Sequence, residues 1–239
     1  MDKKILNIVA LFVVVGIFSG CEKVFTTYGN GRLISMEKTF SSFEKVNVRG
    51  DVEVRFYESE EYLAVITVDE NLCGYVDVFT KNNTLNIGKE GILGCSFTKF
   101  LVEVYCPTLT GVKISGSGNF SGIDEITASS FEAGISGSGK MQGFVDCTNF
   151  SAKISGSGKM TMSGNAVNSN VEISGSGKFI GNELITANTT AGISGSGQAN
   201  VHVSDYLEAK ISGSGAVNYW GNPKTVNTKI SGSGRVKKM

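Results

Sequence analysis

The chain has 239 residues, 41% hydrophobic and 18% charged, and its 22 basic and 22 acidic side chains cancel. This length is enough to bury a sizeable core, as one large domain or two small ones. The balanced charge argues against a nucleic-acid partner, because nucleic-acid-binding domains carry an excess of basic residues. With His202 as the single histidine and no C-x-x-C spacing, we predict neither a metal site nor another cofactor.

The first segment has the order of a bacterial export signal. Two lysines precede an uninterrupted apolar run over residues 8–18, and a Ser-Gly pair stands directly before Cys21. The run is shorter than the about 20 residues that a membrane-spanning helix needs. A cysteine at this place resembles the lipobox, in which the thiol is diacylated. We therefore predict a signal peptide over residues 1–20 and a lipid anchor of palmitate type at Cys21; the alternative is a plain signal peptide with an incidental cysteine.

This anchor predicts where the protein resides. We expect an outer-membrane lipoprotein of the cell envelope, with its body facing either the periplasm or the cell surface. Residues 21–39 contain Thr-Thr and Tyr-Gly-Asn-Gly and are predicted to be a tether from the lipid to the body. Export also permits disulfides, but four thiols allow three pairings and the sequence does not choose among them. The four are Cys73, Cys95, Cys106 and Cys147.

Residues 40–110 alternate apolar and polar side chains, which indicates short strands. The clearest run places Val46, Val48, Val52, Val54 and Phe56 on one parity. Turn-forming residues interrupt the alternation at residues 49–51, 69–71 and 81–83. We predict that this stretch is an irregular β part that continues or caps the repeats after it.

The rest of the chain, residues 111–239, is a repeat. Ile-Ser-Gly-Ser-Gly begins at Ile114, Ile135, Ile154, Ile173, Ile193, Ile211 and Ile230. Counting by twos places the isoleucine, both glycines and the next apolar residue on one face, and both serines on the other, which is strand periodicity. A coil of about 19 residues buries its apolar face only when neighbours stack on it. The sequence therefore predicts an all-β fold, a parallel β-solenoid of about 19-residue coils.

The outward residues of such a stack form ladders. Our candidate binding face combines Lys140, Lys159 and Lys178 with Ser138, Ser157 and Ser176, the second serines of three pentapeptides. Like charges stacked at about 5 Å repel unless they face an anion, so this face would suit an acidic polysaccharide. The alternative is that exposed lysines only keep the surface soluble and discourage strand pairing.

Nothing in the repeats points to catalysis. The acidic residues after position 111 are spread at about one per coil without an Arg or His cluster, unlike the carboxylate pair of a glycosidase. His202 lies in an alternating Val-His-Val run, which favours an outward strand residue over a member of a catalytic triad. We predict a protein that is not an enzyme. A polysaccharide-processing β-helix enzyme and a passive structural spacer remain the alternatives.

The pentapeptide array has a known counterpart. Together with Phe-Glu-Lys-Val-Asn-Val-Arg-Gly-Asp-Val-Glu-Val at residues 43–54 and Asn-Thr-Leu-Asn-Ile at residues 83–87, it resembles the head GIN domain family of putative auto-transporter adhesins over about residues 40–235. The resemblance implies a right-handed β-helix, an envelope location and an adhesin function, with no catalytic residues. The expected partners are the membrane, through the lipid, and a glycan or an envelope or host protein. The edge of the final coil also suggests a homo-oligomer.

Overall fold

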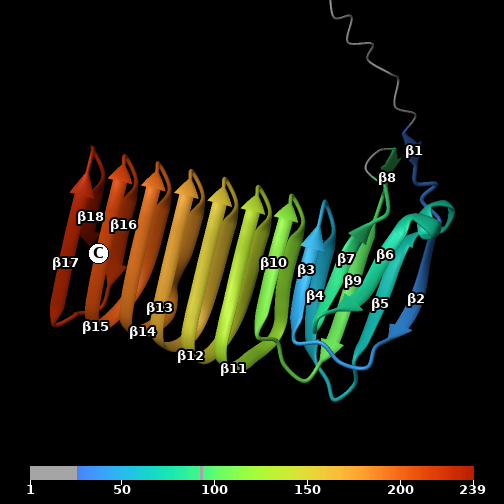
Figure 1. The fold of residues 1–239 in the computed structure, drawn as a ribbon, viewed down its shortest axis with the longest axis horizontal. Helices are drawn as coiled ribbons and strands as arrows, with labels where there is room; N and C mark the ends of the chain where they lie inside the picture. Colours follow the sequence, from blue (N-terminus) through green and yellow to red (C-terminus); the bar gives the residue numbers. More distant parts are fainter. Residues whose placement is uncertain (1–25, 92–93) are drawn as a thin grey trace, which may run out of the picture.

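The structure, a computed structural model, describes residues 26–91 and 94–239. The repeats form a right-handed parallel β-solenoid, in which the chain ascends one face, turns sharply and descends the other (Figure 1). The successive coils are β11 (Asn119–Gly137), β12 (Lys140–Gly156), β13 (Lys159–Gly175), β14 (Lys178–Gly195) and β15 (Gln198–Gly213). This confirms the predicted fold.

A ladder of isoleucines runs through the interior. Ile135 pairs with Ile154, and the same register continues to the pair of Ile211 with Ile230. The six isoleucines from Ile114 to Ile211 are at most 3% exposed, whereas Ile230 in the last coil is 43% exposed. Stacking thus buries an apolar row that one coil alone leaves open to water.

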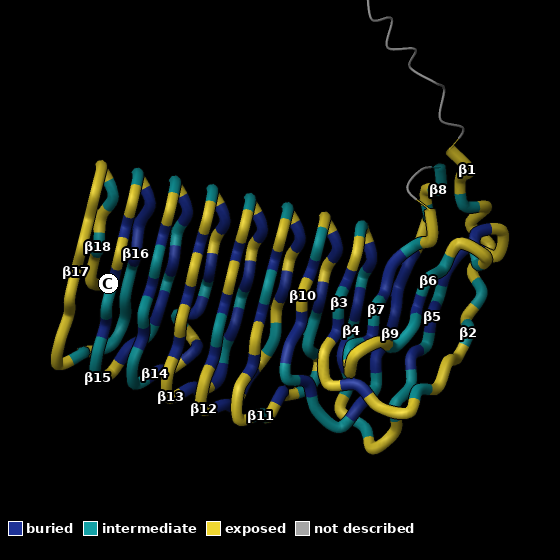
Figure 2. Tube along the Cα trace, viewed as in Figure 1, coloured by how far each residue is buried: buried dark blue, intermediate teal, exposed yellow. Residues whose placement is uncertain are grey.

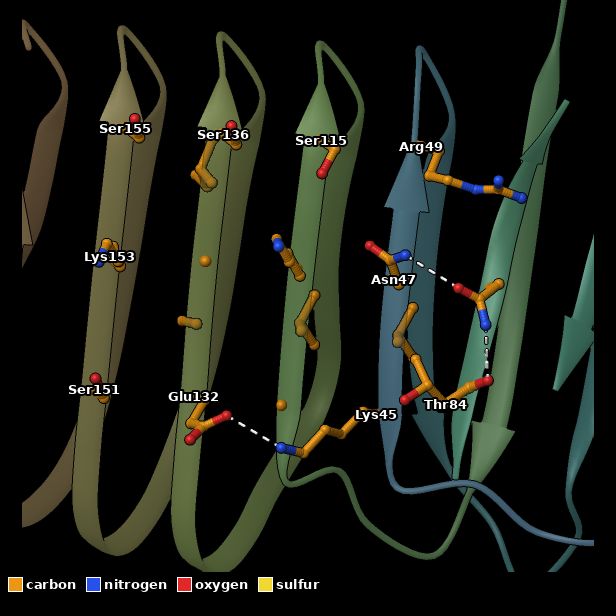
Figure 3. Close-up of a pocket in the computed structure, with 18 of the residues that line it drawn as sticks. Lys45, Asn47, Arg49, Thr84, Ser115, Glu132, Ser136, Ser151, Lys153 and Ser155 are labelled. Atoms are coloured by element: carbon orange, nitrogen blue, oxygen red, sulfur yellow. Dashed lines mark hydrogen bonds and ion pairs between the residues drawn. The ribbon is translucent and has the colours of Figure 1, made fainter. Parts of the chain in front are cut away.

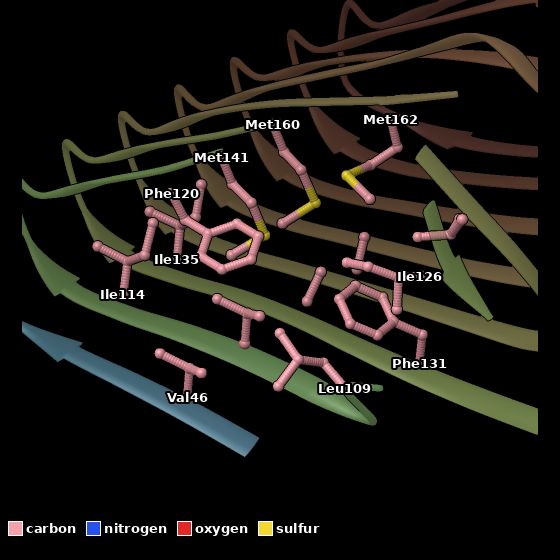
Figure 4. Packing of buried hydrophobic residues seen from close by; sticks show 14 of the residues in the cluster. Val46, Leu109, Ile114, Phe120, Ile126, Phe131, Ile135, Met141, Met160 and Met162 are labelled. Carbon is pink, nitrogen blue, oxygen red and sulfur yellow. The ribbon is translucent and has the colours of Figure 1, made fainter. Parts of the chain in front are cut away.

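Large side chains fill the space between the two faces (Figure 4). Phe120, Met141, Met160 and Phe179 occupy the same place in consecutive coils, and all four are buried. A second row continues the packing near the other end of the coil, where the rings of Phe131 and Phe150 stack with centroids 6.4 Å apart. The apolar residue that follows each pentapeptide therefore belongs to the core, as its parity predicts.

The pentapeptide forms the sharp corner of each coil. Gly156 has φ +117°, and a Cβ there would lie 2.6 Å from the carbonyl oxygen of Gly137. A Cβ on Gly158 would lie 2.5 Å from Cγ2 of Ile135 in the coil below. The first glycine is needed for its backbone conformation and the second for its close approach, so a side chain at either position would disturb the turn.

The coils differ in length, and their extra residues lie outside the segments that lead up to the pentapeptides. Register shifts occur between Ser121 and Glu125, and between Thr161 and Ser163, in the descending half of the coil. From Asn168 to Gly175 the pairing with the next coil has no break. The ascending face therefore has a regular lattice of side chains, while the descending face carries bulges.

The N-terminal region enters this stack through parallel strands and closes it with antiparallel ones. The parallel entry consists of β3 (Lys45–Arg49), β4 (Glu53–Glu58) and β10 (Gly111–Gly116). The antiparallel cap consists of β2 (Leu33–Thr39), β5 (Leu63–Asp69) and β9 (Phe100–Cys106), with β6 (Val76–Lys81) and β7 (Thr84–Lys89) as a hairpin. Two short strands, β1 (Thr27–Tyr28) and β8 (Cys95–Ser96), pair beside it. Inward-facing strand residues are buried on both sides of the junction (Figure 2).

Two sequence predictions are corrected in this region. The predicted tether over residues 21–39 is wrong for its last part, because β2 pairs with β5 along its full length. The predicted turn at residues 69–71 instead opens the 3-10 helix η1 (Glu70–Tyr75). Cys21 and the predicted signal peptide lie outside the described residues. Within residues 26–91 and 94–239, no helix has the length and hydrophobicity to cross a membrane.

Asp69 holds the N-terminal end of the described chain against the cap. Its buried carboxylate accepts hydrogen bonds from the backbone N–H of Gly31 at 2.9 Å and of Thr98 at 2.8 Å, and from the Thr98 hydroxyl at 2.6 Å. The Thr98 hydroxyl bond, followed by these backbone bonds, lowers the pKa of Asp69, while burial opposes the shift. The carboxylate therefore fastens the segments of Gly31 and Thr98 to the segment that carries Asp69.

Candidate functional site

Two shallow, open hollows adjoin on the ascending face and follow one another across the strands. The first, of about 860 Å³, extends from the β6–β7 hairpin to β12, and the second, of about 690 Å³, extends from β12 to β17 (Thr225–Ser231). They share Lys153 and Ser155. We call this continuous surface the ascending-face groove.

The groove is built from the outward positions of the ascending strands (Figure 3). One row contains the first serine of each pentapeptide, including Ser115, Ser136 and Ser155, which pair in register. The row beneath it contains the residue directly before each isoleucine. In order along the solenoid this second row is Lys113, Gly134, Lys153, Glu172, Gly192, Lys210 and Lys229.

Positive charge gathers along the groove although the whole chain is neutral. Seven basic side chains line it against two acidic ones, an excess of five positive charges. The seven are Lys45, Arg49, Lys81, Lys113, Lys153, Lys210 and Lys229, and the two are Glu132 and Glu172. A groove lined by charges of one sign raises the local concentration of oppositely charged ligands.

Ion pairs neutralise only part of this charge. Arg49 lies 2.6 Å from Asp77 and Lys210 lies 2.7 Å from Glu208, two carboxylates outside the groove lining. Within the groove, Lys45 lies 3.1 Å from Glu132, and Lys153 lies 3.6 Å from Glu172. Both pairs are largely exposed, so each contributes little to stability and can exchange its partner for a ligand. Within the described part of the chain, no carboxylate lies within ion-pairing distance of Lys113. The Lys113 ammonium is therefore a positive charge without an ion-pair partner in this part of the chain.

The candidate face predicted from sequence lies elsewhere. Lys140, Lys159 and Lys178 are exposed and adjacent in register, at the start of the descending half of the coil. The predicted lysine ladder therefore exists as a geometric feature, and its role in binding stays a prediction. None of the three lines the ascending-face groove.

The two serines of each pentapeptide lie in different places. Ser138, Ser157 and Ser176 are exposed at the corner, whereas the first serines lie in the groove. Counting by twos carried both serines and the lysine onto one face, but the positive φ of the intervening glycine turns the chain between them. Parity stops at a corner of this kind. Before the corner the alternation holds, and the residue just before each isoleucine has the outward parity that its place in the groove requires.

The thiols and His202 form no reactive cluster. Cys73, Cys95, Cys106 and Cys147 are free thiols. Burial raises the pKa of Cys106 to about 12 and that of Cys147 to about 11, so neither thiol is a nucleophile at neutral pH. His202 is half-buried on β15, with Nδ1 3.2 Å from the carbonyl oxygen of Asn182. Among the described residues no group of three His, Cys, Asp or Glu side chains is placed to bind a metal ion.

The stacked coils and the open groove define a repeat protein of the β-solenoid class that presents an extended surface. The family described as "Putative auto-transporter adhesin, head GIN domain" matches residues 42–223, and the chain belongs to this family. The resemblance seen in the sequence is thereby confirmed. Among curated proteins, none matches the chain.

Solved structures share the fold along nearly the whole chain. A putative adhesin from Bacteroides fragilis is similar with a TM-score of 0.85 at 20% identity, covering 89% of this chain and 100% of its own. A putative adhesin from Parabacteroides merdae has a TM-score of 0.74 at 27% identity, with 90% and 99% covered. A protein named putative lipid binding protein from Parabacteroides distasonis has a TM-score of 0.75 at 22% identity, with the same coverage.

Proposed function

We propose that this protein is a lipid-anchored adhesin of the cell envelope that binds an anionic polymer in its ascending-face groove and catalyses no reaction. The observation that carries the proposal is the row of basic side chains along a groove on a neutral chain, in which Lys81, Lys113 and Lys229 have no ion-pair partner among the described residues. The family and the solved adhesins of the same fold support the adhesin part. The order of residues 1–21 supports the lipid anchor.

The shape of the groove favours a polymer over a small molecule. It is open and crosses the strands from β7 to β17, so a ligand that uses all of it must be long. Small-molecule sites, by contrast, are enclosed and bury most of the ligand. The many exposed hydroxyl and ammonium groups suit a polar, negatively charged chain, and an acidic polysaccharide has that chemistry.

A binding experiment tests this proposal directly. The chain from residue 22 onward, which contains every described residue, is titrated with polygalacturonate, dextran sulfate and neutral dextran. We expect binding to the two acidic polymers that weakens with salt, and none to dextran. The variant Lys113→Glu/Lys153→Glu should bind at least tenfold more weakly.

The matched control places the same charge changes on the other face. Lys140→Glu/Lys178→Glu should bind as tightly as the unmodified chain, because these side chains lie outside the groove. A loss in this control and not in the groove variant would move the site to the predicted lysine ladder. Absence of binding to either acidic polymer would overturn the proposed function.

The anchor has its own test. In cells expressing the full chain, an alkyne analogue of palmitate should label the protein, and Cys21→Ser should abolish the label and release the protein from the membrane fraction. The control Cys73→Ser should keep both. Label that persists in Cys21→Ser would overturn the lipid anchor and leave the groove proposal intact.

A further inference from the structure

The glycines of the repeat region stand at their positions for different reasons. Those of the pentapeptide are required by a positive φ or by backbone atoms that a Cβ would touch. Gly134 and Gly192 are different, because their φ lies outside the left-handed region and a Cβ would meet its nearest atoms at 3.6 Å and 4.0 Å, which is ordinary contact. Gly122 and Gly143 are equally unconstrained, but they lie on the descending half beside the register shift of β11 against β12 and outside the groove. Neither the backbone nor the packing nor a bulge explains Gly134 and Gly192.

An unexplained glycine inside a strand has a cost. Glycine gives up more conformational freedom on folding than any other residue and packs nothing on the sheet surface, so almost any side chain would stabilise the strand better. Strand glycines of this kind often mark a place where a ligand approaches the backbone closely. Both Gly134 and Gly192 line the ascending-face groove, in the row just before the isoleucines.

Their neighbours differ in charge. In register, Gly134 lies between Lys113 on β10 and Lys153 on β12. Gly192 lies between Glu172 on β13 and Lys210 on β15. The missing side chains leave one gap between two ammonium groups and another between groups of opposite charge.

We infer that Gly134 and Gly192 mark two subsites for the sugar rings of one linear acidic polysaccharide that runs along the solenoid axis. This rests on the proposed function and deepens it. A ring at Gly134 presents its carboxylate to Lys113 and Lys153, and the hydroxyls of Ser115, Ser136 and Ser155 border the same part of the groove. Gly192 lies between groups of opposite charge, so it holds a second sugar ring of the same polysaccharide with a smaller contribution from the charge of that ring.

The distance between the subsites sets the length of the ligand. Gly134 lies on β11 and Gly192 on β14, three coils further along. At about 4.8 Å per strand, the two glycines are separated by roughly 14 Å along the axis. A disaccharide is too short to reach from one to the other, whereas an extended chain of six sugars spans both.

Valine substitutions test the subsites without weakening the fold. Gly134→Val and Gly192→Val each fill one gap with a residue that favours strands, so both variants should melt at or above the temperature of the unmodified chain. Against hexagalacturonate, each should bind at least tenfold more weakly. Against digalacturonate, Gly134→Val should still weaken binding at least tenfold, while Gly192→Val should change it less than twofold.

A matched control places valine on the same strand but outside the groove. Ser121→Val on β11 lies on the descending side and should leave binding of both oligomers unchanged. Normal binding by both glycine variants, in a chain whose binding is lost in Lys113→Glu/Lys153→Glu, would overturn the subsites while the proposed function stands. Equal loss in Ser121→Val would also overturn them. No binding of polygalacturonate by the unmodified chain would instead overturn the proposed function itself.

Discussion

The repeat region and the N-terminal region bury their strands in different ways. In the repeats, equivalent positions of successive coils stack in parallel register, so each coil contributes its own isoleucine to one ladder. In the N-terminal region, antiparallel strands cover the end of that stack, and a buried Asp69 joins segments far apart in sequence. The first arrangement spreads its stabilisation over many equivalent residues, whereas the second concentrates it at a few.

The largest expected effect concerns the isoleucine ladder. Ile154→Ala, in the middle of the stack, should lower the free energy of unfolding by about 2–5 kcal/mol, because it leaves a cavity between two filled coils. Ile230→Ala changes the same pentapeptide residue at the exposed end and should cost less than about 1 kcal/mol. Urea unfolding followed by circular dichroism measures both. Equal losses would show that burial within the ladder does not determine stability.

A smaller effect should distinguish the two regions by how their stability responds to acid pH. Because the folded state lowers the pKa of Asp69, this group stabilises the cap above its unfolded pKa of about 3.9, and the stabilisation is lost as pH falls through the lower folded value. Hydrogen exchange across this acid range should show the amides of Gly31 and Thr98 losing protection before the amides of β13. Asp69→Asn should remove this pH dependence. Simultaneous loss in both regions would contradict a separate cap.

The smallest effect is a change in thiol labelling. Cys106 on β9 and Cys147 on β12 report on the two regions, and their raised pKa values should make alkylation at pH 8 slow while the protein is folded. With increasing urea, mass spectrometry should detect labelling of Cys106 before Cys147 if the cap opens first. Half-buried Cys73 and Cys95 serve as the reactive reference. Earlier labelling of Cys147 would reverse the order of stability between the regions.

The difference between the repeat region and the N-terminal region also explains which parts of the fold could be predicted from the sequence. The period of the pentapeptides predicted the solenoid, because a repeated local pattern stacks on itself without long-range information. The parity of Val46, Val48 and Val54 likewise predicted their burial in the entry strands. The pairing of β2 with β5 and the three bonds of Asp69 depend on segments distant in sequence, for which the chain carries no local signal.

The ascending-face groove is less visible in the sequence than the fold. Aligning the pentapeptides brought Lys140, Lys159 and Lys178 into one ladder, as the register shows. The same alignment did not reveal the groove, because its charge becomes visible only when residues of β3, β6 and the repeats are placed side by side. Gly134 and Gly192 look like any other glycine in the sequence, and only their backbone angles and surroundings distinguish them from the corner glycines.

The placement of the bulges bears on how such a surface can change during evolution. Coils of unequal length differ in their descending half, where the register shifts occur. An inserted or deleted residue there leaves the spacing of the opposite lattice intact, and duplication of a whole coil extends that lattice by one step. Because the residue before each isoleucine points away from the core, it can be exchanged without repacking. The molecule thus separates the exposed positions of the ascending-face groove from those that maintain the stack, so the surface can diversify while the architecture stays constant.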